Sequence, residues 1–337
     1  MPTIRGALRN VVLSPALAEV SFARRGFPAT PSAGTDRLER IPQTVICGFE
    51  WAIQARSQWE VERRLAMLDP ELAGFGYEGA TMAFTVLDAT VRGNRTRDLL
   101  SGAGKQHIFL AYIGIGFAMA RLPRVLWKKV LPDLGASEYH PAMSWLAVDG
   151  YGFDRAYFDT RRWVEEQYVP APYPWLGAPG YFPRAVDQGI GRALWFIHGA
   201  DVQGVTDAVE RFAAHRRADL WSGVGLAAAF AGGCGPGELA ALRSAAGDHW
   251  TELALGTVFA AKARSYAGFV PACTETATAA LAGLPVRAAV SLTDDTSPGD
   301  GCPPDTPAYE QWRRNIRDRL AARPASRAAG SDIAARS

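Results

Sequence analysis

Acidic side chains next to glycine-marked segments are the residues with the clearest potential for chemistry. Glu78 directly precedes Gly79, and Asp149 directly precedes the Gly150-Tyr-Gly152 motif. A carboxyl group buried on an apolar helix has a raised pKa, and a carboxyl group whose pKa lies near neutrality can act as a general acid. Glu78 and Asp149 are therefore candidate acid–base groups.

Asp154 and Arg192 complete this candidate catalytic set. Asp154 follows Asp149 by five residues, so on a helix the two would be offset but could share a groove. Arg192 follows Asp187 at the same spacing and is expected to act as an ion partner. For Asp149, Asp187 and Asp219, each shortly before a glycine pair, helix N-capping is an alternative that stays open. Capping explains Glu78 less well, because Glu78 lies within its segment.

Aromatic residues near the same glycines would suit an apolar, unsaturated ligand, because ring faces stabilise a developing cation. The candidate substrate-binding residues are Tyr77, His107, Tyr112, Tyr151, Trp195, Phe196 and Trp221. For His107, the favoured alternative is a core histidine with one hydrogen bond.

Several common kinds of site are not indicated. The five histidines have no metal-ligand spacing, and the sequence has no GxSxG motif. Asp294-Asp295 continues as Thr-Ser-Pro in an expected loop, which does not fit a magnesium-binding DDxxD helix. The glycine pairs have no third glycine and follow no convincing strand, so they do not form a dinucleotide fingerprint. The sequence predicts no metal site and leaves the cofactor open.

The glycines recur at a regular interval. Four segments contain Gly-x-Gly and three weaker copies contain one glycine, which places the repeat at 48, 79, 116, 152, 191, 225 and 256. The gaps of 31 to 39 residues are typical of stacked helical units. Helix formers follow each glycine, and charged helix candidates such as 205–216 lie in between. The repeat predicts an all-α fold of about seven helical hairpins, either a TPR-like solenoid or an α/α toroid.

Glycine inside a helix costs about 1 kcal/mol relative to alanine. A repeated glycine therefore implies a structural role that offsets this cost. The role is either close packing of two helix backbones or clearance for a ligand.

The prolines and polar stretches suggest boundaries. We expect an irregular N-terminal lead-in at 1–40, a helical repeat domain at 41–290, a mobile loop at 291–308, a C-terminal helix at 309–323 and a disordered tail at 324–337. The segment 169–182 contains four prolines and four aromatics, and either covers a cavity as a lid or paves the surface.

Charge and composition limit which kinds of partner and which location are expected. The 36 Lys and Arg residues nearly balance the 34 Asp and Glu residues, so a nucleic-acid partner is not indicated. The four isolated cysteines are typical of buried thiols in a reducing compartment. We expect no signal peptide and no membrane span, since the longest candidate (108–120) is too short. A cytoplasmic location is therefore expected.

Four blocks of the sequence resemble one family. Residues 77–83 resemble an FxEGAxMA segment, 149–158 a DGYGFxxxYF block, 191–196 GRxLWF and 219–227 DLWSGVGLA. Together, over about residues 40–320, they resemble the UnbL-type family of uncharacterised proteins associated with enediyne polyketide gene clusters. Asp154 departs from the pattern, because many relatives are expected to have histidine there. That departure weakens a catalytic role for Asp154.

The resemblance implies an accessory biosynthetic enzyme in enediyne-type polyketide biosynthesis that acts on an apolar polyene, by cyclisation or rearrangement. One alternative is an isoprenoid (terpene) cyclase without the usual aspartate-rich motif. Another is a TPR-like scaffold that docks other biosynthetic proteins. A closed aromatic cavity containing Glu78 or Asp149 would favour an enzyme, whereas an open groove with exposed polar residues would favour a scaffold.

Overall fold

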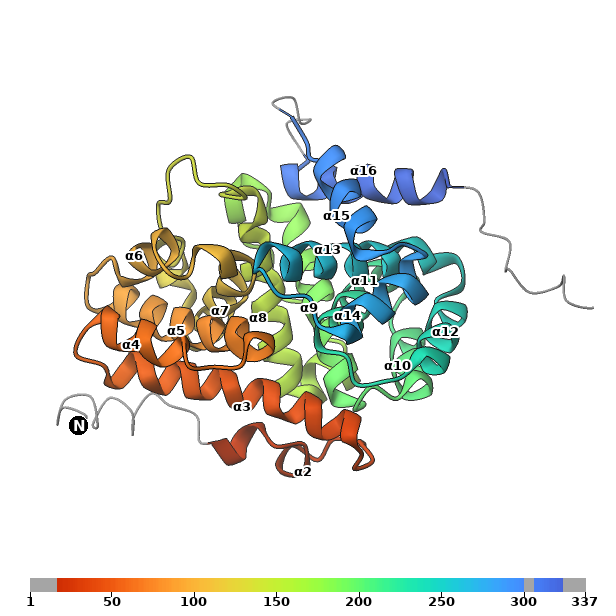
Figure 1. The fold of residues 1–337 in the computed structure, drawn as a ribbon, viewed down its shortest axis with the longest axis horizontal. Coiled ribbons are helices and arrows are strands. Elements are labelled where there is room, and N and C mark those ends of the chain that lie inside the picture. Colours follow the sequence, from red (N-terminus) through yellow and green to blue (C-terminus); the bar gives the residue numbers. More distant parts are fainter. Residues whose placement is uncertain (1–16, 300–305, 324–337) are drawn as a thin grey trace, which may run out of the picture.

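Seven long helices form the body of the protein, and each packs against the next in chain order (Figure 1). The computed structural model describes residues 17–299 and 306–323, and every regular element within these ranges is helical. The expected all-α helical repeat fold is therefore confirmed. The seven helices are α3 (Ala33–Gln54), α5 (Pro70–Thr90), α7 (Ile108–Arg121), α8 (Trp145–Phe158), α9 (Phe182–Ile197), α11 (Ala214–Ala231) and α13 (Trp250–Tyr266).

Shorter elements connect these seven helices or cover their ends. The other α-helices are α2 (Phe22–Arg25), α4 (Gln58–Leu65), α6 (Arg95–Ser101), α10 (Val202–Arg211), α12 (Pro236–Ala245), α14 (Ala272–Ala277), α15 (Val286–Asp295) and α16 (Ala308–Ala321), of which α16 is as long as α7 and α8. The 3-10 and π turns are η1 (Leu17–Val20), η2 (Lys105–His107), η3 (Arg124–Lys129), η4 (Ala142–Ser144), η5 (Arg161–Glu165), η6 (Trp175–Gly177), η7 (Pro179–Tyr181), η8 (Gly247–His249) and η9 (Thr278–Ala282).

Neighbouring long helices run in the same direction. Side-chain contacts show this, because they join the start of one helix to the start of the next, or the end of one to the end of the next. Such pairs are Arg37 with Glu71, Arg121 with Asp154, Trp195 with Gly232 and Arg264 with Phe230. The connecting segments therefore return the chain to the start of the next long helix, as a hairpin repeat requires.

The returning segments are less regular than seven helical hairpins would be. Between α7 and α8 the chain forms only the 3-10 turns η3 and η4, and between α8 and α9 it forms η5, η6 and η7. Both connections are rich in proline, which has no backbone N–H to donate within a helix. The expectation of a second helix in every repeat is wrong for these two connections.

Close backbone contacts join each long helix to the next. A Cβ atom on Gly150 would lie within 3.0 Å of the Ile113 backbone, and one on Gly116 would lie equally close to the backbone of α8. Side chains essentially never reach such distances. Glycine therefore packs the helices together, as one of the two sequence interpretations proposed. Glycines in equivalent contacts are 48, 79, 114, 152, 189, 191, 223, 225 and 256.

The Gly-x-Gly motif follows from having a neighbour on each side. Two residues correspond to about 200° of rotation around a helix, so the two glycines lie on nearly opposite sides. In α8, Gly150 contacts the preceding helix α7 and Gly152 contacts the following helix α9. Helices α3 and α13 stand at the ends of the row and have a single glycine of this kind, at Gly48 and Gly256. The weaker copies at the two ends are therefore explained by position, whereas α5 has a neighbour on each side and only Gly79 in such a contact.

The row curls so that its first helices contact its last. Gly34 at the start of α3 packs against the backbone of Gly233, which follows α11. The guanidinium Nη1 of Arg264 on α13 donates a hydrogen bond of 2.7 Å to the carbonyl of Glu71 on α5. The C-terminal helix α16 lies across the top of the view in Figure 1 and packs on α13.

Two expected boundaries are wrong. The irregular lead-in was expected to reach residue 40, but α3 begins at Ala33. Ser32 and Thr35 form a capping box there, and this local hydrogen bonding outweighs the nearby prolines. The loop expected from residue 291 begins later, because α15 continues to Asp295. Residues 1–16, 300–305 and the expected tail at 324–337 lie outside the described residues.

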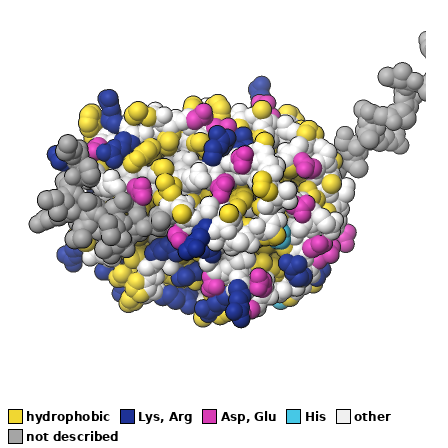
Figure 2. All heavy atoms as spheres, turned by 90° about the horizontal axis from the view of Figure 1, so that it is seen from below, with side chains coloured by type: hydrophobic (Ala, Val, Ile, Leu, Met, Phe, Trp, Pro, Cys, Tyr) yellow, Lys and Arg dark blue, Asp and Glu magenta, His cyan; other side chains and the backbone are white. Residues whose placement is uncertain are grey.

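The surface mixes charges of both signs with apolar side chains. Figure 2 shows one face on which Asp and Glu are scattered, while Lys and Arg are most frequent along the edge drawn at the bottom. In the part of the chain that the structure describes, no helix combines the length and apolar character needed to span a bilayer.

We predict that Gly189→Ala destabilises the protein strongly. The new Cβ would overlap the carbonyl of Asp149 and the backbone nitrogen of Phe153, so α8 and α9 would have to separate. Such overpacking costs on the order of 3 kcal/mol. Urea unfolding of the two proteins measures the difference.

Gly237→Ala on α12 is the matched control, because no atom lies within 4 Å of its added Cβ. This change should leave the free energy of unfolding unchanged or raise it by about 0.5 kcal/mol. Equal effects at the two positions would contradict the role of backbone contact.

Candidate functional site

The glycine contacts determine which residues face the centre of the curled row. The residue before the first glycine and the residue after the second are four apart, so they share one helix face. This face points inward: Glu78 on α5, Phe153 on α8 and Arg192 on α9 all line a central cavity. The residue between the glycines, such as Tyr151, lies on the opposite face.

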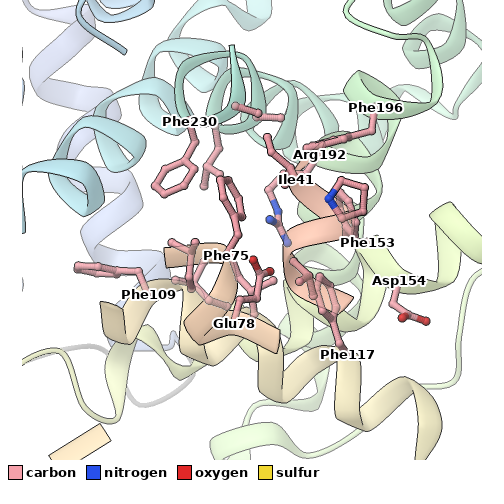
Figure 3. Close-up of a pocket in the computed structure, with 18 of the residues that line it drawn as sticks. Ile41, Phe75, Glu78, Phe109, Phe117, Phe153, Asp154, Arg192, Phe196 and Phe230 are labelled. Atoms are coloured by element: carbon pink, nitrogen blue, oxygen red, sulfur yellow. The ribbon is translucent and has the colours of Figure 1, made fainter. Parts of the chain in front are cut away.

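The cavity is bordered by all seven long helices and is mainly apolar (Figure 3). The space open to the centre of a water molecule is about 90 Å³. On this measure one water molecule needs about 10–15 Å³. The cavity can therefore hold a chain of several groups of about that size. Its aromatic wall comprises Phe75, Phe109, Phe117, Phe153, Tyr157, Phe158, Phe196, Phe230, Phe259 and Tyr309. Among the described residues of its lining, Arg121 is exposed, whereas the others are buried or partly buried.

Glu78 lies in this wall with an uncompensated carboxyl group. It is 3% exposed, and no group among the described residues forms a hydrogen bond with its side chain. Burial raises its pKa from 4.5 to about 8, Arg192 opposes this rise, and Asp149 adds to it. The carboxyl group is therefore mostly protonated at neutral pH. In Figure 3 it points toward the same central region as the Arg192 guanidinium.

Arg192 is held between an acid and an aromatic ring. Its Nε atom donates a hydrogen bond of 2.6 Å to the Asp149 carboxylate, and its guanidinium lies 5.0 Å from the centre of the Phe153 ring. Burial raises the pKa of Asp149, whereas Arg192 lowers it. Because this pair joins α8 to α9 behind the cavity wall, Asp149 acts on the cavity through Arg192.

Asp154 lies apart from this group, at one side of the site in Figure 3. Its Oδ2 atom accepts a hydrogen bond of 2.9 Å from Arg121, while its Oδ1 atom has no partner among the described residues. Burial raises its pKa to about 6, and Arg121 opposes the rise. The expected shared groove with Asp149 is wrong, because Asp149 pairs with α9 and Asp154 pairs with α7.

Comparison with known families shows which family the chain belongs to. A family model described as "Protein of unknown function (DUF1702)" matches residues 4–320. The chain belongs to this family. No curated protein and no solved structure matches it.

The acids before the glycine pairs of this DUF1702 chain are not helix caps. Asp149, Asp187 and Asp219 lie four or five residues inside α8, α9 and α11, where the backbone N–H groups already have partners in the helix. Asp187 instead accepts hydrogen bonds from Arg216 on α11, at 3.0 Å from its Nε. The capping interpretation is therefore wrong, and these acids form buried ion pairs between helices.

Asp219 belongs to a buried network that fixes α16. It accepts hydrogen bonds from Arg184 (2.8 Å) and Gln188 (2.9 Å) on α9. It also lies 3.4 Å from Arg313 on α16. Glu310 on α16 has a pKa lowered to about 2: burial would raise it, but Arg313 and other arginines outweigh burial. Because α16 places Tyr309 in the cavity wall, the network closes one side of the site.

Of the seven residues predicted to bind substrate, the structure places only Phe196 in the cavity wall. Each of the other six packs elsewhere among the helices. Tyr77 stacks on His107 at 4.4 Å, and the Tyr112 hydroxyl hydrogen-bonds to His140 at 2.9 Å. Burial lowers the pKa of His107 to about 4, so this side chain is neutral. Tyr77, His107 and Tyr112 therefore lie outside the lining of this cavity, and their substrate-binding role stays a prediction.

The same correction applies to the aromatics next to the glycine motifs. The Tyr151 ring contacts Trp127 at 5.0 Å on the outer side, and Trp195 donates a hydrogen bond of 2.8 Å to the Gly232 carbonyl. Trp221 is buried outside the cavity lining. Nearness to a glycine in sequence does not decide which face of the helix a ring occupies. The proline-rich segment 169–182 likewise contributes no residue to the cavity lining, so the lid interpretation is wrong.

A sequence signal for the missed residues does exist. Phe117 and Phe153 directly follow the second glycine of their motifs, and Ile113 directly precedes the first. Reading each motif for its flanking residues would have found them. In the described residues, no group of three His, Cys, Asp or Glu side chains is placed to hold a metal ion.

We predict that Glu78 makes stability fall as pH rises. Its pKa of about 8 in the folded protein exceeds the ordinary value of 4.5, so the folded state binds a proton that the unfolded state releases. This stabilisation is complete below about pH 4.5 and is lost as pH rises through about 8. Glu78→Gln should therefore gain stability relative to wild type between pH 5 and pH 9, as measured by urea unfolding.

Glu275→Gln removes an exposed carboxylate on α14 and controls for surface charge. If the difference between Glu78→Gln and wild type stayed constant over this pH range, the raised pKa would be refuted.

Proposed function

We propose that the protein is an accessory biosynthetic enzyme that binds an apolar polyene in the seven-helix cavity and catalyses its cyclisation or rearrangement. The observation that supports this proposal is Glu78, a buried carboxyl group without a hydrogen-bond partner among the described residues, in a cavity wall that is mostly aromatic and aliphatic. Its pKa of about 8 keeps it protonated at neutral pH. Such a group suits proton donation to an apolar ligand.

The proposed reaction needs no external reagent. Glu78 gives its proton to one carbon of a double bond, whose electron pair forms the new C–H bond and leaves a cation on the conjugated chain. A second double bond attacks this cation when a ring forms. Loss of a proton from a neighbouring carbon to the Glu78 carboxylate restores both the double bond and the acid. The product is an isomer of the substrate.

The surrounding residues fit the charges that this reaction creates. The faces of Phe117, Phe196 and Phe259 can stabilise a cation on the chain. Arg192 is already paired with Asp149, which reduces its repulsion of that cation. It can also stabilise the Glu78 carboxylate that remains after proton donation, since it opposes the rise in the pKa of Glu78.

The resemblance of the sequence blocks to the UnbL-type family supports a polyene from an enediyne-type polyketide synthase as the substrate. The protein would then work in the cytoplasm beside that synthase. An isoprenoid is the alternative substrate, because the same proton-first chemistry applies. A scaffold role is less well supported, since the central feature is an apolar cavity and not an exposed polar groove.

We predict that purified protein converts a linear polyene to an isomer of equal mass, and that Glu78→Gln lowers kcat about a hundredfold or more because the proton donor is lost. Product analysis by mass spectrometry and NMR measures both. Turnover should fall as pH rises through about 8, when Glu78 loses its proton.

Glu275→Gln should retain full activity. Isoprenoid diphosphates, tested in parallel, distinguish the two substrate classes. If wild type converts neither class but binds a synthase protein tightly, the enzyme proposal is wrong and the scaffold alternative gains support.

A further inference from the structure

A second cleft, lined by arginines, adjoins the cavity at the N-terminal ends of α3 and α5. It shares Ile41, Phe75 and Ala231 with the lining of the cavity, so these side chains form the border between the two spaces. The remaining residues of the cleft are Arg37, Arg40, Asp69, Glu71, Leu72 and Arg264. A polar cleft therefore lies directly beside the apolar one.

Arg264 in this cleft is a buried cation without a counter-ion in the part of the chain that the structure describes. It is 3% exposed, and its guanidinium lies over the rings of Phe230 (3.8 Å) and Phe75 (5.5 Å), both of which line the cavity. Its Nη atoms donate to the backbone carbonyls of Glu71 and Phe230. Its Nε atom has no partner, and no carboxylate among the described residues lies within ion-pair distance. Burial lowers its pKa to about 10, so it stays charged at neutral pH.

The neighbouring charges do not compensate Arg264. The Glu71 carboxylate is paired with Arg37, and Asp69 caps α5 by accepting from the Glu71 backbone N–H. Arg40 is exposed and has no ion pair within the described ranges. The cleft thus contains three guanidinium groups and two carboxylates. An isolated buried charge is costly unless a partner of opposite sign is present.

We propose that this arginine cleft binds the anionic end of an amphiphilic ligand whose apolar chain occupies the cavity. The anion is a carboxylate or a phosphate, because a guanidinium group offers both of these a matching pair of N–H donors. This inference rests on the proposed occupancy of the cavity by an apolar chain and is independent of turnover.

The part of the cavity beside Arg121 is less suited to an anion. Arg121 is exposed there and already donates to Asp154, whose second oxygen lacks a donor. An anionic group beside Asp154 would meet a carboxylate, whereas one beside Arg264 would meet an unpaired cation. The ligand is therefore oriented with its charged end at Arg264.

A fluorescent polyene acid tests the proposal directly. cis-Parinaric acid and its methyl ester share one conjugated chain and differ in charge, and their fluorescence reports binding to an apolar site. Wild type should bind the acid about tenfold more tightly than the ester, as one charge-assisted contact would give. Arg264→Gln should abolish this preference while it leaves ester binding unchanged, and Arg40→Gln should weaken it. Competition by dodecanoate and by dodecyl phosphate distinguishes the two kinds of anion.

Arg319→Gln, an exposed arginine on α16, is the matched control for loss of one positive charge and should keep the preference. Should Arg264→Gln fail to fold, Arg40→Gln decides, since Arg40 is exposed and makes no ion pair among the described residues. Equal binding of acid and ester by wild type would overturn the anion site and leave the apolar cavity as a binding site. Binding of neither probe would overturn the proposed function as well. Loss of preference in Arg121→Gln but not in Arg264→Gln would place the anion at the wrong end and overturn the inference.

Discussion

The close approach of neighbouring helix backbones at glycine is the constraint on which the rest of the structure depends. Eleven glycines of the long helices occupy positions where a Cβ atom would overlap the next helix. Each costs about 1 kcal/mol relative to alanine in a helix, so the set costs about 10 kcal/mol. That sum is as large as the net stability of a typical domain, so packing at these contacts must more than offset it. The same contact, made between successive helices, holds the row together and lets it curl around the cavity.

This contact also fixes the rotation of each helix, and the rotation forces particular residues inward. Asp149, Gln188 and Ser222 each precede a glycine pair, and each has a partner on a neighbouring element: Arg192, Asp219 and Arg313 respectively. Glu78 occupies the equivalent place on α5 and has no such partner among the described residues. Equivalent positions in the repeat can therefore be compared with one another. Asp149, Gln188 and Ser222 are satisfied by contacts between helices, whereas Glu78 is left facing an apolar cavity.

The sequence predicted much of the fold but little of the cavity wall. The period of the glycines was sufficient to predict the number of long helices, because the glycines recur at a regular spacing whatever the sequence of the loops between them. Glu78 and Arg192 could be proposed because a charged residue on an otherwise apolar helix needs a compensating partner when it is buried. The aromatics were mostly placed on the wrong helix face, because residues adjacent in sequence such as Trp195 and Phe196 lie about 100° apart around α9. The role of Asp219 required knowing that Arg313, about ninety residues away, would pack against it, and no local pattern contains that information.

The two uncompensated groups beside the cavity have different consequences for a bound chain. Among the described residues, Glu78 and Arg264 have no ionic partner, whereas Arg192 and Arg313 have theirs. A ligand can therefore satisfy the first two without disturbing the contacts that hold the helices. An anion held at Arg264 would fix one end of a polyene, and the chain would then pass along the aromatic wall in a single direction. A fixed end brings one part of the chain to Glu78 on every binding event. The position of protonation, and hence the product, would then be set by the length of chain between the two groups.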